Sequence, residues 1–198
     1  MLLKIIQTGD DTLRNMAQPV TKAQLTSKKI QDLIDLMIIT LHDAPGVGLA
    51  APQVGESLQL LVIHDKKDYH DQVPASLLAE QRRKPLPITV MVNPVLAVTN
   101  PNLVTYFEGC LSIDGYVGAV QRAKQVTVTG WDRQGKKITI TASDWYARVL
   151  QHEIDHLVGA LYVDKINLKS FISQKNFNLK WRKCLQAEII AKFGDRTR

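Results

Sequence analysis

Two histidines and a glutamate stand close together in this sequence, in the segment His152-Glu153-Ile154-Asp155-His156. Positions i and i+4 of a helix lie on one face, so both imidazoles can bind one metal ion. Glu153, one residue further on than His152, can then reach a water molecule held by that ion. The pattern is typical of metal-dependent hydrolases. The alternative is a pair of core histidines that only form hydrogen bonds.

A catalytic metal of this kind takes three protein ligands and leaves one position open. Downstream of His156 there is no further histidine and there are only three carboxylates. Upstream, Cys110 in the segment EGCLS, residues 108–112, lies between a predicted strand and a turn. Its thiolate would complete a Cys, His, His set, although a small buried hydrophobe is the simpler interpretation of this cysteine taken alone.

Hydrophobic periodicity predicts the elements that must hold these residues. Apolar side chains recur on one face over residues 27–43, which predicts a helix with Ser27 as its N-cap. The glycine- and proline-rich segment 44–55 predicts a loop, and residues 58–64 predict a buried strand.

The middle of the chain is predicted to be mostly β. Residues 65–87, rich in proline and charge, predict a surface insertion. Strands are then predicted over 88–98 and 103–109. Alternating segments at 124–132 and 136–142 predict a hairpin.

Two helices are predicted in the last third of the chain. One begins at Ser143 or Asp144, runs to about Val158 and ends at Gly159, and the other covers 176–193. The fold class is therefore α+β, with mostly antiparallel β-sheets packed around a central HExxH metal-binding helix, an N-terminal helix and a C-terminal helix. Residues 1–168 are expected to form one catalytic domain, and residues 169–198 a basic helical extension.

Charge and composition narrow the class of protein. The 45% hydrophobic and 22% charged residues are those of a folded domain. The net charge of +6 lies wholly in residues 169–198, which hold 8 basic and 2 acidic side chains against 17 of each before them. Two cysteines exclude a disulfide-dense scaffold. We expect no membrane span and no signal peptide, and a cytoplasmic location.

Three segments of the chain together resemble the three motifs of the peptide deformylase family. They are residues 46–53, GVGLAAPQ, residues 108–112, EGCLS, and residues 151–159, QHEIDHLVG. Their order and rough spacing also fit, and the resemblance extends from Asp11 to Ile166.

The resemblance implies a reaction and a set of roles. The family removes the formyl group from the N-terminal formyl-methionine of newly made polypeptides and releases formate. By this resemblance Cys110, His152 and His156 bind one divalent metal ion, commonly Fe(II), with zinc, nickel or cobalt able to replace it. Glu153 transfers the proton. The Gln53 side-chain amide and the Leu111 backbone N–H stabilise the developing oxyanion.

Substrate contacts are expected from the glycine loop and the EGCLS strand. Val47, Gly48 and Gly109 would hold an extended peptide through its main chain, and Val149 would line an apolar pocket for methionine. Arg122 matches a family arginine, and we expect it to pair with Asp155 and so support the metal-binding helix.

This sequence departs from the family pattern next to EGCLS. Residues 113–115 read Ile-Asp-Gly where an apolar residue, proline and glycine are frequent. Val117 stands where many bacterial members have an arginine that contacts substrate in some of them. Peptide affinity or preference is therefore expected to differ.

Three other kinds of protein fit parts of the sequence. A zincin-type metallopeptidase would share HExxH but lacks a suitable downstream ligand. A dinucleotide-binding enzyme would use the glycines at 46 and 48, but these follow a helix and meet Pro52 at once, so no nucleotide cofactor is expected. A non-catalytic deformylase-like binding protein would be expected to lose Glu153 or Gln53, and both are present.

The basic C-terminal segment has two interpretations. It can be a helix that packs on the body and exposes a solvated basic face. It can also contact ribosomal RNA, since some deformylases dock on the ribosome through a C-terminal helix and Lys and Arg contacts to phosphate need no sequence.

Overall fold

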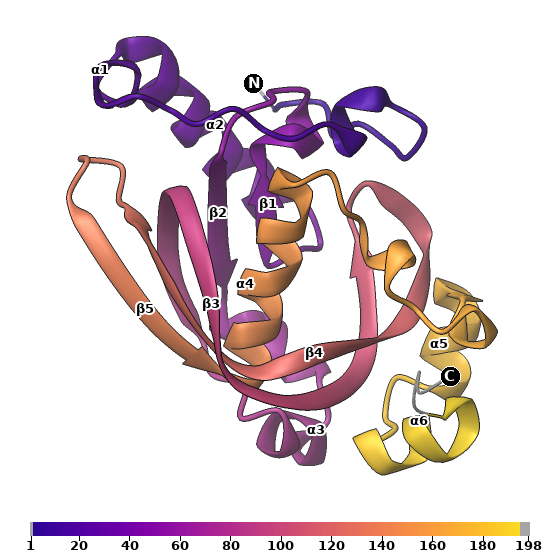
Figure 1. The fold of residues 1–198 in the computed structure, drawn as a ribbon. Coiled ribbons are helices and arrows are strands. Elements are labelled where there is room, and N and C mark those ends of the chain that lie inside the picture. Colours follow the sequence, from indigo (N-terminus) through magenta and orange to yellow (C-terminus); the bar gives the residue numbers. More distant parts are fainter. Residues whose placement is uncertain (1, 195–198) are drawn as a thin grey trace.

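A single curved antiparallel sheet dominates the computed structural model, which describes residues 2–194. The strand order is β1-β2-β3-β4-β5, and β6 pairs with β4. Figure 1 shows this sheet curving around helix α4, which packs against the first five strands. The strands are β1 Gly48–Ala50, β2 Leu60–Asp65, β3 Leu86–Cys110, β4 Ile113–Trp131, β5 Lys137–Ser143 and β6 Ile172–Ser173.

Six α-helices and five 3-10 helices accompany the sheet in the described residues. The α-helices are α1 Lys22–Leu25, α2 Lys28–Asp43, α3 Ala75–Glu80, α4 Asp144–Leu157, α5 Gln174–Lys180 and α6 Gln186–Phe193. The 3-10 helices are η1 Asp11–Arg14, η2 Ala51–Val54, η3 Lys67–Gln72, η4 Tyr162–Asp164 and η5 Leu168–Ser170.

Helix α2 confirms the prediction for residues 27–43. The Ser27 hydroxyl accepts a hydrogen bond from the Ile30 backbone N–H and caps the helix. The apolar face, including Met37 and Leu41, is buried in a cluster with Leu60 and Val62 of β2. One sheet face and one helix stripe thus cover each other.

The β-rich middle of the chain differs from its prediction in two details. The predicted strands 88–98 and 103–109 belong to one long strand, β3, with register shifts that bend it. The segment 44–55, predicted as a loop, contains β1 and η2, because its backbone pairs with β2. The predicted hairpin is confirmed as β4 and β5.

Helix α4 also follows its prediction. Ser143 precedes the helix, which ends at Leu157. Gly159 follows with a φ of +72°, and its Cα lies against the Arg14 carbonyl, so no side chain fits there. Ala147, Val149 and Leu150 face the core cluster beneath the sheet.

The segment 65–87 is not only a surface insertion, so that prediction is partly wrong. Asp65, at the end of β2, is fully buried. Its carboxylate accepts two hydrogen bonds of 2.8 Å from Arg83 and one of 2.9 Å from Trp145 Nε1. Charged residues near both ends of the segment therefore anchor it, although most of the segment, including Lys84 and Pro87, lies on the surface.

The prediction of one helix over 176–193 is wrong. The chain turns between α5 and α6, and Glu188 accepts a hydrogen bond of 2.8 Å from the Leu185 backbone N–H to start the second helix. This turn brings Phe177, Trp181 and Phe193 against the ring of Phe107 on β3. Residues 195–198 of the predicted extension lie outside the described residues.

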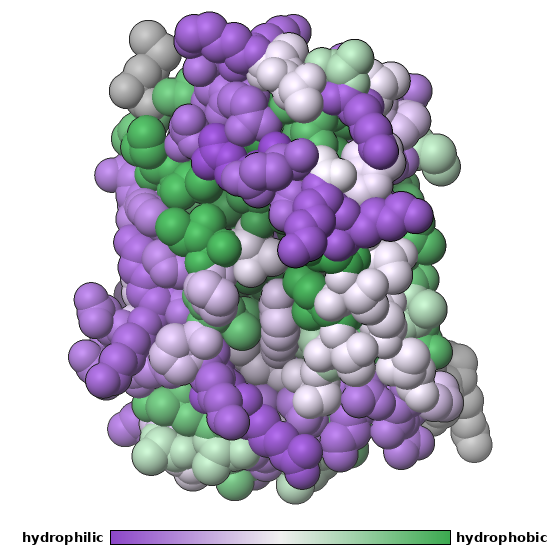
Figure 2. Space-filling model, turned by 90° about the vertical axis from the view of Figure 1, so that its left-hand side faces the viewer, coloured by the Kyte–Doolittle hydropathy of each residue, from purple (hydrophilic) through white to green (hydrophobic). Residues whose placement is uncertain are grey.

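Hydrophilic and hydrophobic residues are mixed on the face of the molecule that Figure 2 shows. Figure 2 views the side on which β5 lies in Figure 1, and there hydrophobic residues show between hydrophilic groups above and below them. No helix in residues 2–194 is both long and apolar enough to cross a membrane.

Candidate active site

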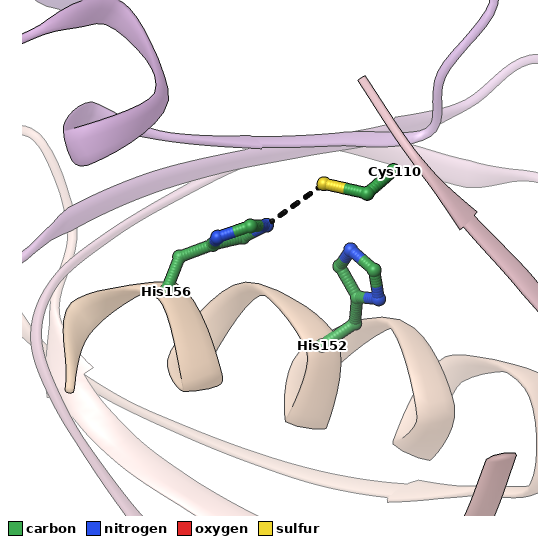
Figure 3. A group of neighbouring side chains, drawn as sticks. All are labelled: Cys110, His152 and His156. Atoms are coloured by element: carbon green, nitrogen blue, oxygen red, sulfur yellow. Dashed lines mark hydrogen bonds between the residues drawn. The ribbon is translucent and has the colours of Figure 1, made fainter. Parts of the chain in front are cut away.

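Helix α4 and the end of β3 bring three predicted metal ligands together. Figure 3 shows His152 and His156 rising from one face of α4 toward Cys110. The Cys110 Sγ and His156 Nε2 atoms lie 3.3 Å apart, and one ligand atom from each of the three residues falls within 4.8 Å of the others. One thiolate and two imidazoles at this spacing fit a borderline divalent metal ion.

Glu108 orients one of the two histidines. Its Oε2 atom lies 3.0 Å from His152 Nδ1, which directs His152 Nε2 toward the ligand cluster. Sequence reasoning missed this residue as a functional one. The signal was present, because side chains two apart on a strand share a face, and Glu108 stands two residues before Cys110.

Two buried arginines hold the Glu108 carboxylate. Arg122 donates to both of its oxygens, at 2.9 and 2.8 Å. Arg148 donates to Oε1 at 2.6 Å. Burial opposes ionisation of Glu108, but the two guanidinium groups and the bond to His152 hold the pKa of the carboxyl well below its usual range. Arg148 was also missed, although it lies one helical turn before His152.

Arg122 also forms an ion pair with Asp155 on α4. Lys165 reaches the same carboxylate, at 2.6 Å. The structure therefore contains the predicted Arg122–Asp155 contact within a larger network that joins β3, β4 and α4.

The two histidines have opposite electrostatic environments. Burial lowers the pKa of His156 well below its usual value, and the nearby His152 adds to that effect. Burial acts in the same direction on His152, but hydrogen bonds to Cys110 and Glu108 outweigh it and raise its pKa. A bound cation would replace that proton, since metal ligands must be neutral imidazoles.

Glu153 lies buried beside the ligands with an unpaired oxygen. The residue is 4% exposed, and its Oε2 atom has no hydrogen-bond partner among the described residues. Burial raises the pKa of this carboxyl to about 7. A methyl group on Gly48 would collide with the Glu153 carboxyl, so this glycine makes room for it.

Gln53 points into the same site. It is 1% exposed, and its Oε1 atom accepts a 2.9 Å hydrogen bond from the Ala50 N–H. Its Nε2 amide faces the Cys110 sulfur at 3.4 Å and the Ser112 hydroxyl at 3.3 Å. The amide is thus held as a donor next to the ligand cluster.

Residues 6–8, whose role the sequence analysis missed, form hydrogen bonds to both η2 and the turn after β3. Ile6 N–H donates to the Gln53 carbonyl, and Thr8 N–H donates to the Ser112 carbonyl. Gln7 Nε2 donates to the Leu111 carbonyl at 2.9 Å. These bonds fix the position of the turn that contains Leu111 relative to η2.

The predicted substrate-binding residues lie around this centre. Gly48 lies in β1, a terminal strand of the sheet, and Gly109 lies in β3 opposite Val117. Val149 is 4% exposed in the core cluster against which Val47 packs. Gly109 and Val149 therefore lie in β3 and α4, the elements of the three candidate ligands, and Gly48 lies against Glu153 of α4.

Comparison with known proteins identifies the family. The model of the polypeptide deformylase family matches residues 2–171. This chain belongs to the polypeptide deformylase family. The resemblance seen in the three sequence motifs is thereby confirmed.

Individual relatives of the chain are also peptide deformylases. The chain is 46% identical over 178 residues to peptide deformylase 1A, chloroplastic/mitochondrial, of Arabidopsis thaliana, covering 90% of this chain and 66% of that protein. It is 36% identical over 179 residues to the mitochondrial peptide deformylase of Homo sapiens, covering 90% and 72%. The chain thus spans just under two thirds of the plant relative's length.

A solved deformylase shares the fold. The Met-Ala-Ser-bound class I type b peptide deformylase of Acinetobacter baumannii superposes with a TM-score of 0.74 at 32% identity, covering 84% of this chain and 99% of that one.

Val117, which departs from the family pattern near EGCLS, lies between two neighbouring strands in this deformylase-family chain. Val117 pairs with Gly109 on one side and with Ile172 of β6 on the other. The Tyr116 ring stacks on Phe171, with centroids 4.9 Å apart. The strand edge at this position is thus apolar and partly covered by the chain's own C-terminal segment.

Proposed function

We propose that this protein removes the formyl group from the N-terminal formyl-methionine of newly synthesised polypeptides and releases formate. One observation carries the proposal. A buried Glu153 carboxyl, with one oxygen that has no hydrogen-bond partner among the described residues, lies beside a Cys, His, His set in a chain of the polypeptide deformylase family. Helix α4 is, in this proposal, the metal-binding helix.

Cys110, His152 and His156 would hold one divalent ion, and Fe(II) is the native ion we propose. Zinc, nickel or cobalt can use the same ligands, because availability as well as ligand softness decides occupancy. When bound, such an ion supplies an activated water near neutral pH and polarises the formyl carbonyl. Metal content after anaerobic purification tests the identity of the ion.

Glu153 would accept the proton of the attacking water and return it to the leaving amine. The Glu153 oxygen that has no hydrogen-bond partner can accept that proton. A carboxyl pKa of about 7 suits a group that must both accept and donate a proton near neutral pH.

Two donors would stabilise the tetrahedral stage of the reaction. The Gln53 amide, held by Ala50 and turned toward Cys110, is one, and the Leu111 backbone N–H is the other. Removal of one such donor typically costs about 2.7 to 4 kcal/mol in the barrier.

The peptide would bind as an added strand along Val47 and Gly48 on one side and Gly109 on the other. Support comes from the place of β1 at the end of the strand order. A relative binds Met-Ala-Ser, a tripeptide that begins with methionine. Val149 would contribute to the methionine pocket, and Arg122 with Asp155 would hold α4 in place.

The decisive assay uses anaerobically purified protein and formyl-Met-Ala-Ser, with release of formate as the measurement. We expect turnover that falls by about 10² to 10⁴ in Glu153→Ala, with metal content unchanged. Equal turnover of that variant, or none by the wild type with Fe(II) bound, would contradict the proposal. Internal cleavage of unformylated peptides would indicate a metallopeptidase instead.

We also propose that residues 1–168 are the catalytic domain and that the basic extension contacts ribosomal RNA. The family match ends close to that boundary, at residue 171. Lys175, Lys180 and Lys183 are exposed, whereas Ile189 on α6 is buried. Changing these three lysines to glutamate should weaken co-sedimentation with ribosomes, and unchanged binding would contradict the contact. A cytoplasmic location stays a prediction.

A further inference from the structure

A second pair of histidines lies outside the site described above, where α2 meets β2. His42 Nε2 and His64 Nδ1 lie 2.7 Å apart, and the two ring centroids are 4.8 Å apart. His42 is in the last turn of α2, and His64 is near the end of β2. Both residues are half-buried.

The surroundings of the pair disfavour the protonated form of each ring, the form that would compete with a cation. Burial lowers the pKa of each imidazole, and the charge of Lys66 lowers it further. One facing nitrogen carries the shared proton and the other a lone pair. When the donor ring takes its other tautomer, with the proton on the nitrogen that faces away, both facing nitrogens direct a lone pair at one point, which is the arrangement that a metal ion requires.

We propose that His42 and His64 form a second divalent-metal site, separate from the Cys, His, His centre and suited to Zn²⁺. At Zn–N distances of about 2.0 to 2.1 Å, tetrahedral coordination places two ligand nitrogens roughly 3.3 Å apart. The two rings would therefore separate by roughly 0.6 Å, and water would occupy the remaining positions.

The surroundings set the strength of this site. The Asp65 carboxylate next to His64 is committed to Arg83 and Trp145, so it does not serve as a third ligand. The charge of Lys66 repels a cation. This site therefore binds zinc more weakly than the Cys, His, His centre.

A zinc ion bound at this site would also stabilise the position of the segment 44–47, which leads into the candidate active site. The His64 backbone N–H donates to the Val47 carbonyl at 2.9 Å, and the segment 44–47 begins where α2 ends. A zinc ion on the two side chains would tie the end of α2 to β2 at the base of that segment.

Equilibrium dialysis of the full chain against Zn²⁺ tests the site without any assay of activity. We expect two equivalents of bound zinc in the wild type, and one in His64→Gln and in His42→Gln. Loss of a contact that only supports a ligand already weakens metal binding at least about tenfold, and these variants remove a ligand itself. Glutamine can still hydrogen-bond to the remaining imidazole, so each variant should fold. Lys66→Gln should bind the second equivalent more tightly than the wild type.

Thermal unfolding provides an independent readout. With one equivalent of zinc already bound, further zinc should raise the Tm of the wild type but not that of His64→Gln. A single equivalent in the wild type would overturn the proposal. A second equivalent that persists in both histidine variants would do so as well, because the ion would then lie elsewhere.

Discussion

At the scale of single residues, Gly48 shows how one missing side chain shapes the site. Sequence reasoning assigned it to substrate contact alone, yet the Glu153 carboxyl fills the space where its Cβ would stand. Any larger residue must displace the group that we propose as the proton carrier.

Gly48→Ala should therefore impair turnover rather than folding. We expect formate release to fall by at least about 10², the lower bound for loss of a positioned general base. Far-UV circular dichroism and metal content should match the wild type. Full activity in this variant would show that Glu153 can act from another position.

Glu108 acts on the site through His152 rather than through substrate. In Glu108→Gln the bond to His152 Nδ1 weakens and two buried guanidinium groups lose their shared anion. We expect metal affinity to fall by about 10- to 100-fold, measured by competition with a chelator.

Glu80→Gln provides the matched control for that measurement. Glu80 is exposed, and its carboxylate accepts hydrogen bonds from Tyr106 and the Gln186 N–H rather than from a ligand histidine. Its variant should keep the wild-type metal affinity, and an equal loss in both variants would argue against a specific role for Glu108.

At the scale of elements, the ion pair between Asp65 and Arg83 joins the segment 65–87 to β2. The Asp65 side chain is fully buried and that of Arg83 is 10% exposed, and the Arg83 guanidinium also stacks on the Trp145 ring at 4.1 Å. Removing one partner of a buried pair leaves the other charge uncompensated, whereas removing both leaves a neutral contact.

Asp65→Ala should lower the free energy of unfolding by about 3 to 5 kcal/mol. Asp65→Leu combined with Arg83→Met should recover most of that loss. Equilibrium urea unfolding measures both variants. A double variant no more stable than Asp65→Ala would show that the pair is not coupled and that the segment is held by other contacts.

At the scale of the whole molecule, the proposed metal ligands come from two elements that only the folded chain brings together. Because β3 supplies Cys110 and α4 supplies both histidines, the ion would bind the native state far better than the unfolded chain. Metal binding would then contribute to the stability of the whole domain.

Chelation should therefore lower the Tm of the protein. At a free metal concentration one hundred times Kd, the bound ion adds about 2.7 kcal/mol to the free energy of unfolding. Differential scanning calorimetry with and without chelator measures the shift. In Cys110→Ser the difference between the two conditions should shrink, and an unchanged difference would place the stabilising ion elsewhere.

The sequence by itself determined the local elements and the ligand candidates. Helix α2 with its Ser27 cap, helix α4 with its stop at Gly159 and the β4–β5 hairpin depend on periodicity and on residues near in sequence. His152 and His156 share a helix face for the same reason.

Only the tertiary structure decided the contacts between elements. The Glu108–Arg148 bond, the Asp65–Arg83 ion pair, the packing of Phe193 on Phe107 and the facing of His42 and His64 each join residues of different segments. Such contacts depend on how the elements pack. The sequence does not distinguish a charged or aromatic side chain that is buried against a partner from one that is exposed to water.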